Sequence, residues 1–322
     1  MSSETPALSV ILIATTNYAL IRYAVRNLTR QRDVAIELVI AAPEALRASI
    51  TLEDSKDLAA FAAWKHVVIP DGTQFDVARA MAVRAASAPL IAFTEDHSFP
   101  QPGWAAALVS AFTDGVTVVG PVVANGNPDS MVSRANFLLE YGEWMPPGRR
   151  DGRSHLPGHN SAYRRDALVA LGDRLTTLIE AESVLHWELR AGGHRLVQEP
   201  KAVTHHVNFS RFQPSVALRY HLGRHFAARR AEGWSVAKRA GYAAAFPLIA
   251  LVRVARVASL GVGSREMPAV MAALPMVALM VTVSSIGESI GYVTREPGSS
   301  GAFLSDIEHN RHRFVREGEL PT

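Results

Sequence analysis

The sequence PLIAFTEDH, at residues 89–97, decides how the first half of this chain is interpreted. Its first part, Pro89–Phe93, is a short apolar run, which is typical of a strand buried on both faces of a parallel sheet. Glu95, Asp96 and His97 follow this strand directly. Carboxylates suit Mg²⁺ or Mn²⁺, and an imidazole favours Mn²⁺. On their own, however, the three residues are explained equally well by an acidic turn that caps the next helix.

Strands and helices alternate around this stretch over the first 120 residues. Apolar runs predict strands at Leu8–Ala14, Ile36–Ile40, Trp64–Ile69, Pro89–Phe93 and Val116–Val123, and helical spacing predicts helices at Leu20–Leu28, Asp76–Ala86 and Trp104–Phe112. This order predicts an α/β fold with a mostly parallel sheet flanked by helices. Ligands bind at the carboxyl ends of the strands in such sheets. Thr15, Thr16 and Asn17 follow the first strand, so we expect them at the same edge as the acidic cluster.

The next region is less regular. Residues 124–160 are rich in Gly and Pro and are expected to form loops. Arg149, Arg150 and Arg153 lie there, in a loop that could close over phosphates or could be a plain linker. Beyond this region the pattern predicts helices at Arg165–Leu171 and Ile179–Ala191, and strands at Arg195–Gln198 and Pro200–His206.

Two pairs of titratable residues in this second part have the chemistry of a site. Glu180 and Glu182 are two residues apart, so they do not share a helix face. One could act as a general base, although attraction to the helix dipole explains both acids more simply. His205 and His206 end a predicted strand, where one of them could reach the same metal, but such a pair is more often structural.

A third candidate is the segment from Leu156 to Arg165. Gly158 allows close approach of the backbone, and Asn160 can bond a sugar hydroxyl. An ordinary loop that leads into a helix explains the segment as well.

The chain changes character after about residue 210. Nine Lys or Arg and a single acid, Glu232, lie between Arg211 and Arg256. Such a basic block indicates contact with an anionic membrane or with phosphate, or else a solvated helix face. Helices are predicted at Val216–Arg239 and Ala243–Val257.

A run of about 20 residues, Met267–Ile286, carries no charge and is just long enough to cross a hydrocarbon core of about 30 Å. Pro268 and Pro275 make an in-plane or re-entrant hairpin equally compatible with the sequence, and a buried helical pair of a soluble protein is the third alternative. We therefore divide the chain into a domain at 1–210, a basic and apolar helical region at 211–296, and a polar, poorly ordered tail at 297–322.

Composition excludes some chemistry. The chain has no Cys, which rules out disulfides, thiolate nucleophiles and Cys–zinc sites. Residues 1–7 carry no positive charge before the short apolar run at Leu8–Ala14, so no signal peptide is expected. No G-x-G-x-x-G follows a predicted strand, which disfavours a dinucleotide oxidoreductase. The loop after the first strand lacks the Gly-rich, basic signature of a nucleotidyltransferase.

Taken together, the order and spacing of these elements resemble the family 2 glycosyltransferases, which have the glycosyltransferase A fold, over roughly residues 7–210. Leu8–Asn17 resembles the opening strand and its Thr-x-Asn nucleotide loop. Thr73–Arg84 resembles the helix whose Arg lies near the pyrophosphate, here Arg79 or Arg84. Glu95, Asp96 and His97 take the place of the Asp-x-Asp metal motif, and Pro100 and Trp104 follow as expected.

The resemblance also gives roles to residues farther along the chain. Gly158, His159 and Asn160, followed by Arg164 and Arg165, resemble the acceptor-side segment. Glu182 falls where the family places its catalytic base, and His206 falls where many members carry a metal-binding His. The resemblance thus implies Thr15, Thr16, Asn17, Arg79 or Arg84, and Asp96 as donor-binding residues, and Glu95, His97 and His206 as metal ligands.

This sequence also departs from the family pattern. Ala41, Ala42 and Pro43 stand where the family usually has acids that hold uracil and ribose. Glu95 and His97 replace Asp in the metal motif, and Glu188 stands where an Arg often follows the base. The region 211–296 resembles the membrane-associated bacterial members.

The resemblance implies an inverting, metal-dependent glycosyltransferase that uses Mn²⁺ or Mg²⁺. It would move a sugar from a nucleotide-diphosphate donor to a hydroxyl of a lipid-linked or saccharide acceptor. We expect it at the cytoplasmic face of the cell membrane, peripheral or integral, with no nucleic-acid partner. The missing acids motivate one alternative, a non-catalytic member that binds nucleotide-sugar or lipid as a membrane scaffold.

Overall fold

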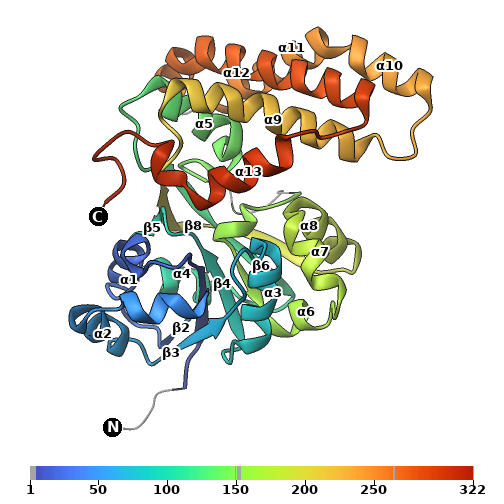
Figure 1. Cartoon of the computed structure of the whole chain (residues 1–322). Coiled ribbons are helices and arrows are strands. Elements are labelled where there is room, and N and C mark those ends of the chain that lie inside the picture. The colour runs from blue at the N-terminus through green and yellow to red at the C-terminus, as the bar shows by residue number, and fades with distance from the viewer. Residues whose placement is uncertain (1–4, 149, 151–153, 264, 322) are drawn as a thin grey trace. The chain divides into compact units, whose positions relative to one another are not determined.

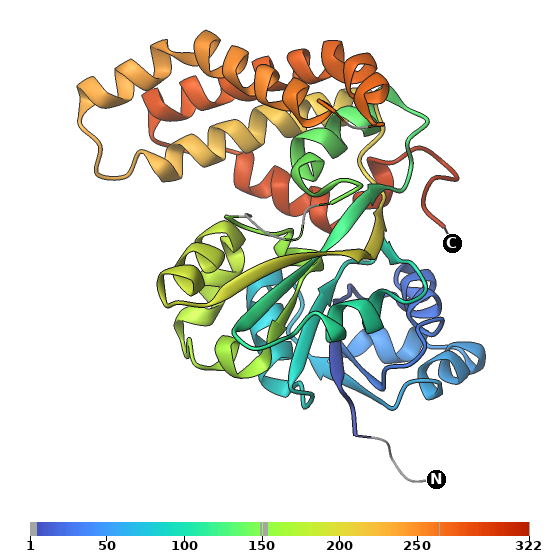
Figure 2. The same ribbon diagram turned by 180° about the vertical axis from the view of Figure 1, so that it is seen from behind.

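The computed structural model of the chain describes residues 5–148, 150, 154–263 and 265–321. These residues form two compact units (Figures 1 and 2). One consists of Met1–Gly126, Trp144–His206 and Pro321–Thr322, and the other of Asn127–Glu143 and Val207–Leu320. Arg149 and Arg153 of the predicted phosphate loop lie outside the described residues.

The first unit is built on an eight-stranded sheet with the order β3-β2-β1-β4-β7-β6-β8-β5. The strands β3, β2, β1 and β4 are parallel, and β8 is parallel to β6, whereas β7 and β5 run antiparallel to their neighbours. The predicted mostly parallel α/β sheet is therefore confirmed. Strand bounds are β1 Leu8–Ile13, β2 Ile36–Ala42, β3 Ala63–Val68, β4 Leu90–Thr94, β5 Ser98–Pro100, β6 Val116–Asn125, β7 Ala162–Arg164 and β8 Arg195–His206.

Helices cover both faces of this sheet, which is why its central strands are mostly apolar. The helices α3, α6, α7 and α8 share one continuous core with the sheet, in which Ile11, Val39 and Tyr163 are buried. The helices α1, α2 and α4 lie on the other side (Figure 1). Helix bounds are α1 Arg22–Leu28, α2 Leu52–Ala59, α3 Phe75–Ala85, α4 Trp104–Ser110, α6 Arg165–Val169, α7 Arg174–Glu180 and α8 Glu182–Ala191.

A buried acid fixes the amino ends of the first three strands. The Glu37 side chain is fully buried, pairs with Lys65 Nζ at 2.7 Å, and accepts hydrogen bonds from Ser9 and Ser87. Burial alone would raise the pKa of Glu37, but these partners stabilise the carboxylate and lower the pKa to about 2. The sheet edge opposite the acidic cluster is therefore held by a charged anchor.

The second unit is helical. Its helices are α5 Met131–Glu140, α9 Phe212–Arg230, α10 Val236–Ala244, α11 Phe246–Leu260, α12 Met267–Thr294 and α13 Ser300–His309. Two expectations were wrong here. Residues 131–140 form a helix inside the region expected to be loops, and residues 300–309 form a helix where a poorly ordered tail was expected.

Among the described residues, α12 is long and apolar enough to cross a membrane, and α10 with α11 forms a second candidate that is bent by 56°. Yet α12 also packs within the unit. A Cβ atom at Gly287 would lie 2.2 Å from the Tyr220 carbonyl oxygen, and one at Gly291 would lie 2.4 Å from that of Arg224. The polar helix α9 therefore lies directly against the carboxyl-terminal half of α12.

The basic block of the second unit is engaged inside that unit. Arg253 pairs with the buried Glu288 of α12, Arg256 pairs with Glu143, and Arg219 pairs with Glu140 at 2.7 Å. The other six have partners too: Arg211 with the Val315 carbonyl, Arg224 with the Glu296 carbonyl, Arg229 with Glu232, Arg230 with the Tyr292 hydroxyl, Lys238 with the Trp234 ring, and Arg239 with the carbonyls of Tyr292 and Val293. Arg219, Arg253 and Arg256 therefore link elements of this unit that are far apart in the sequence.

Candidate functional site

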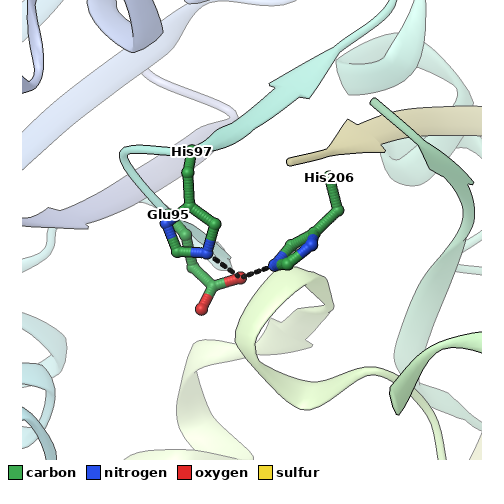
Figure 3. Close-up of side chains that lie close together, drawn as sticks. All are labelled: Glu95, His97 and His206. Carbon is green, nitrogen blue, oxygen red and sulfur yellow. Dashed lines mark ion pairs between the residues drawn. The ribbon is translucent and has the colours of Figure 1, made fainter. Parts of the chain in front are cut away.

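Glu95, His97 and His206 meet at the carboxyl end of β4 (Figure 3). One ligand atom from each lies within 4.8 Å of the others. Glu95 Oε2 is 3.5 Å from His206 Nε2 and 3.7 Å from His97 Nε2, and the two rings meet edge to face with centroids 4.6 Å apart. Residues more than 100 positions apart come together because β5 pairs with the last residues of β8, with Ser98 opposite His206.

Asp96 orients one of the His rings of the cluster so that its ligand nitrogen faces Glu95. Asp96 Oδ1 is 2.6 Å from His97 Nδ1, which leaves His97 Nε2 directed toward Glu95. A carboxylate behind a His is the usual way to fix the tautomer and orientation of a metal-binding imidazole. Asp96, predicted to bind the donor, is thus placed by the structure behind His97, with 39% of its side chain exposed.

The cluster has the electrostatic character of a cation site. Burial would raise the pKa of Glu95, but His97, His159 and His206 around it lower the pKa well below its usual value. Glu95 is therefore ionised, and His97 Nε2 is buried without a hydrogen-bond partner among the described residues. One carboxylate and two imidazoles suit Mn²⁺ better than Mg²⁺, which prefers oxygen ligands, so the residues fit Mn²⁺, one of the two predicted ions.

The turn Gly158–Asn160 lies beside this cluster. Asn160 Nδ2 donates to Glu95 Oε2 at 2.9 Å, and His159 Nδ1 is 3.6 Å from Glu95 Oε1. On its other side, His159 Nε2 contacts a carboxylate oxygen of Glu182 and lies 2.7 Å from Arg79 Nη1. One imidazole therefore spans the distance between the cluster and Glu182.

Glu182 is the first residue of α8, where the helix dipole favours a carboxylate. A Cβ atom at Gly158 would lie 2.6 Å from the Glu182 carboxyl carbon. The absence of a side chain at Gly158 thus makes room for Glu182 next to His159. Glu180, by contrast, ends α7 and is exposed.

The structure separates residue pairs that the sequence left open. Arg79 reaches His159, whereas Arg84 is exposed in the last turn of α3 and donates to the Gly172 carbonyl at 3.3 Å. His206 faces the cluster, whereas His205 lies on the other face of β8 and contacts Gln101. Arg84 and His205 are therefore not part of the assembled site.

The predicted nucleotide loop follows β1, the strand next to β4. Thr15 is half-buried, and Thr16 and Asn17 are exposed. The Asn17 side-chain oxygen accepts from the Ala19 amide and so caps a short helix. No contact joins these three residues to the cluster in the described residues, but they stand at the same sheet edge. Arg150, from the predicted phosphate loop, pairs with Glu199.

A hollow of about 460 Å³ opens at the carboxyl ends of β2 and β3. Its lining includes the apolar residues Pro43, Val68 and Ile69 and two acids, Glu44 and Asp71. The sequence lacked acids at positions 41–43, but the structure brings these two to the same edge. Neither acid was predicted, because Glu44 follows the expected position by one residue and Asp71 follows a different strand.

A buried histidine holds the turn Gly158–Asn160 against α8. The Leu156 amide donates to His186 Nδ1 at 3.2 Å, so Nε2 carries the proton and donates to the Tyr163 hydroxyl at 2.9 Å. That hydroxyl in turn donates to the Gly158 carbonyl at 3.4 Å. Sequence reasoning missed His186, although its position four residues after Glu182 puts both on one helix face.

This network predicts a pH dependence of stability. Burial lowers the pKa of His186 to about 3, from 6.5 in an exposed His. Between these pH values the unfolded chain binds a proton at His186 that the folded chain does not bind. The contribution of neutral His186 to the free energy of unfolding is therefore present above pH 6.5 and is lost as the pH falls toward 3. From pH 7 to pH 5 the free energy of unfolding should lose about 2 kcal/mol through His186. Denaturant unfolding at both pH values, compared with His186→Gln, would show this as a steeper loss in the wild type; equal losses would contradict it.

The profile of the family described as Glycosyl transferase family 2 matches residues 9–172, more than half of the 322 residues. Glu182 and His206 lie beyond this match, so their assignment depends on the geometry above. No curated protein matches the chain significantly.

Among solved structures, the chain is similar to the mannosyltransferase PcManGT from Pyrobaculum calidifontis in complex with GDP-Man and Mn²⁺. The TM-score is 0.53 and the identity 17%, over 90% of this chain and 86% of that one. It is also similar to GalNAc-T7 with UDP, GalNAc and Mn²⁺ (TM-score 0.49, identity 12%, 65% and 44% covered). A third is glucosyl-3-phosphoglycerate synthase from Mycobacterium tuberculosis with Mn²⁺, UDP and phosphoglyceric acid (0.40, 18%, 66% and 74%). The first likeness shows the fold.

Proposed function

Because this chain belongs to glycosyl transferase family 2, and is therefore a nucleotide-sugar-dependent glycosyltransferase, we propose that it is a metal-dependent, inverting enzyme that glycosylates a hydroxyl of a lipid-linked or saccharide acceptor. One observation carries this proposal. His159 joins Glu95, and with it the His97 and His206 cluster, to the carboxylate of Glu182. A leaving-group site and a base therefore stand one imidazole apart.

Glu95, His97 and His206 would hold the divalent cation. When bound, the cation stabilises the negative charge that develops on the departing diphosphate. Arg79 adds a guanidinium charge on the same side, since it lies 2.7 Å from His159. Asp96 fixes the His97 ring in the orientation that keeps Nε2 directed at the cluster.

Glu182 would act as the base. The acceptor hydroxyl transfers its proton to the Glu182 carboxylate while its oxygen forms a bond to the anomeric carbon of the donor. The bond between that carbon and the diphosphate oxygen breaks, and the electron pair leaves with the diphosphate. Attack from the face opposite the leaving group inverts the configuration. His159 and the small Gly158 set the position of the carboxylate.

The donor would lie along the carboxyl ends of β3, β2, β1 and β4. Adjacent strands are about 4.8 Å apart, so this edge is about 14 Å wide, which suits a nucleoside diphosphate. The hollow lined by Pro43, Glu44 and Asp71 is at one end of the edge and Glu95 is at the other. Thr15 and Thr16 stand between them, after β1.

Donor hydrolysis tests the activity. We expect the purified chain with Mn²⁺ to release nucleoside diphosphate from at least one member of a panel of UDP-, GDP- and dTDP-sugars, and to stop when EDTA is added. Absence of turnover with every donor, together with retained binding of a nucleoside diphosphate, would instead favour the non-catalytic scaffold.

The membrane is the proposed location, with attachment along its surface. Apolar side chains of α11 and α12 are exposed, including Leu248 (63%), Leu251 (66%) and Met271 (52%). Large exposed apolar patches mark interaction sites. The polar helix α9 occupies one face of the carboxyl-terminal half of α12 and is ill-suited to hydrocarbon. This favours an in-plane arrangement over a crossing by α12.

Vesicle flotation tests this attachment. Replacing Leu248 and Leu251 with Ser should reduce binding to phosphatidylcholine–phosphatidylglycerol vesicles more than tenfold, because each buried Leu contributes about 1.5–3 kcal/mol. Leu52→Ser is the matched control, since Leu52 is 88% exposed in the first unit. Unchanged flotation would overturn the proposal, as would a dimer in solution that the double substitution dissociates.

A further inference from the structure

We propose that Asn160 is a positioning residue for the cation site, held in place by a buried chain of hydroxyls, and that it does not bind the acceptor. This inference rests on the proposed function, because it takes Glu95 as a ligand of the divalent cation. It changes the role that the sequence assigned to Asn160. It also adds two residues, Ser98 and Thr204, that the sequence did not single out.

The buried chain of hydrogen bonds consists of three side chains behind Glu95. Thr204 Oγ1 is 3.0 Å from Ser98 Oγ, Ser98 Oγ is 2.6 Å from Asn160 Oδ1, and Asn160 Nδ2 is 2.9 Å from Glu95 Oε2. Thr204 and Ser98 come from the paired strands β8 and β5. Ser98, Thr204 and Asn160 are at most 2% exposed, so water does not compete for these bonds.

The direction of each hydrogen bond in this series follows from the bond at its Glu95 end. Asn160 Nδ2 donates to Glu95 Oε2, so the amide presents its nitrogen to Glu95 and its oxygen to Ser98. The single Ser98 proton is then donated to Asn160 Oδ1, which leaves Thr204 as the donor to Ser98. Each side chain in the series therefore donates to the next one, from Thr204 through Ser98 and Asn160 to Glu95.

This arrangement holds the carboxylate oxygen that the cation would use. Glu95 Oε2 is the atom nearest to both His97 Nε2 and His206 Nε2, and it is the atom that Asn160 fixes. A carboxylate that is held in this way does not have to lose rotational freedom when a cation binds. Both polar groups of the Asn160 amide are occupied and the residue is buried, so no part of it is offered to an acceptor hydroxyl.

The test is Mn²⁺ affinity, measured by the electron paramagnetic resonance signal of free Mn²⁺ on the full chain without any nucleotide. Asn160→Ala should weaken Mn²⁺ binding about 10- to 100-fold, the usual cost of losing an outer partner of a metal ligand. Thr204→Val keeps the shape and removes only the first donor, so it should cost about fivefold, the equivalent of one hydrogen bond.

Asn136→Ala is the matched control. Asn136 is a fully buried Asn of the second unit that bonds the Phe209 carbonyl, Ser215 and Arg219. Its removal should lower thermal stability without changing Mn²⁺ affinity, which separates positioning from general destabilisation. If the wild type binds Mn²⁺ but Asn160→Ala and Thr204→Val bind it equally well, the inference is wrong. If the wild type itself binds no Mn²⁺, the proposed cation site fails instead.

Should Asn160→Ala not fold, Thr204→Val still decides the question, because it removes a single hydroxyl and leaves the volume nearly unchanged. Wild-type Mn²⁺ affinity in a folded Thr204→Val chain would overturn the proposal. A fivefold loss of Mn²⁺ affinity in Thr204→Val, together with normal Mn²⁺ binding by the control Asn136→Ala, would support it.

Discussion

Glu182→Gln is expected to lower the turnover number about 10²- to 10⁴-fold, the usual contribution of a positioned general base. The substitution keeps the size of the side chain and its place at the start of α8, but removes its capacity to take a proton. Donor affinity should stay nearly unchanged, because the cluster around Glu95 is intact. Steady-state kinetics with a competent donor and acceptor would show a fall in kcat with little change in the donor KM.

Glu180→Gln provides the matched control for this prediction. Glu180 is two residues away, exposed at the end of α7, and its substitution should leave kcat unchanged. Full activity in Glu182→Gln would remove Glu182 from the mechanism. Equal losses in both variants would point to a disturbance of the α7–α8 connection rather than to a lost base.

Glu95→Gln should have the second large effect, because it removes the only carboxylate among the three clustered side chains. Outer partners of metal ligands cost about 10- to 100-fold in affinity when they are lost, so the loss of a ligand charge should exceed 10²-fold. Isothermal titration with Mn²⁺ would measure this. Transfer activity at a fixed, limiting Mn²⁺ concentration should fall in parallel.

Glu53→Gln is the control for Glu95→Gln, since Glu53 is a surface acid of α2 with 74% of its side chain exposed. Its Mn²⁺ affinity should equal that of the wild type. A Glu95→Gln chain that binds Mn²⁺ normally would mean that the cation, if bound, sits elsewhere.

The sheet could be predicted because parallel strands covered on both faces leave an unmistakable apolar signal. The antiparallel strands β5 and β7 were missed, since three residues each are too few to show a period. Helix α2 was also missed, although Thr51 and Asp54 form a capping box before it. Helix α5 begins at the N-cap Ser130 but lies among Gly and Pro, which hid it.

Within the site, spacing identified candidates but not directions. Arg79 and Arg84 are five residues apart on one helix, so they project about 140° apart and only one can face the site. His205 and His206 are neighbours on a strand, where successive side chains point to opposite faces, so only one of them can face the cluster. The partners Ser98 and Thr204 are 106 positions apart, and only the pairing of β5 with β8 brings them together.

The second unit shows what composition cannot resolve. A basic block beside an apolar helix predicted contact with an anionic membrane or with phosphate, or else a solvated helix face. The structure instead engages these residues with Glu143, Glu288 and backbone carbonyls far along the chain. The resulting unit still exposes apolar side chains, so a membrane contact would depend on burial of these side chains more than on charge.

The central claim is that one divalent cation at Glu95, His97 and His206 joins a nucleoside diphosphate to this chain. Thermal unfolding with UDP, GDP and dTDP, each with and without Mn²⁺, tests it most directly. A ligand at 100 times its Kd stabilises a protein by about 2.7 kcal/mol. We therefore predict that at least one nucleoside diphosphate clearly raises the Tm when Mn²⁺ is present and does not raise it without Mn²⁺. In Glu95→Gln this rise in Tm should be lost. The same rise without Mn²⁺, or an undiminished rise in Glu95→Gln, would contradict the account.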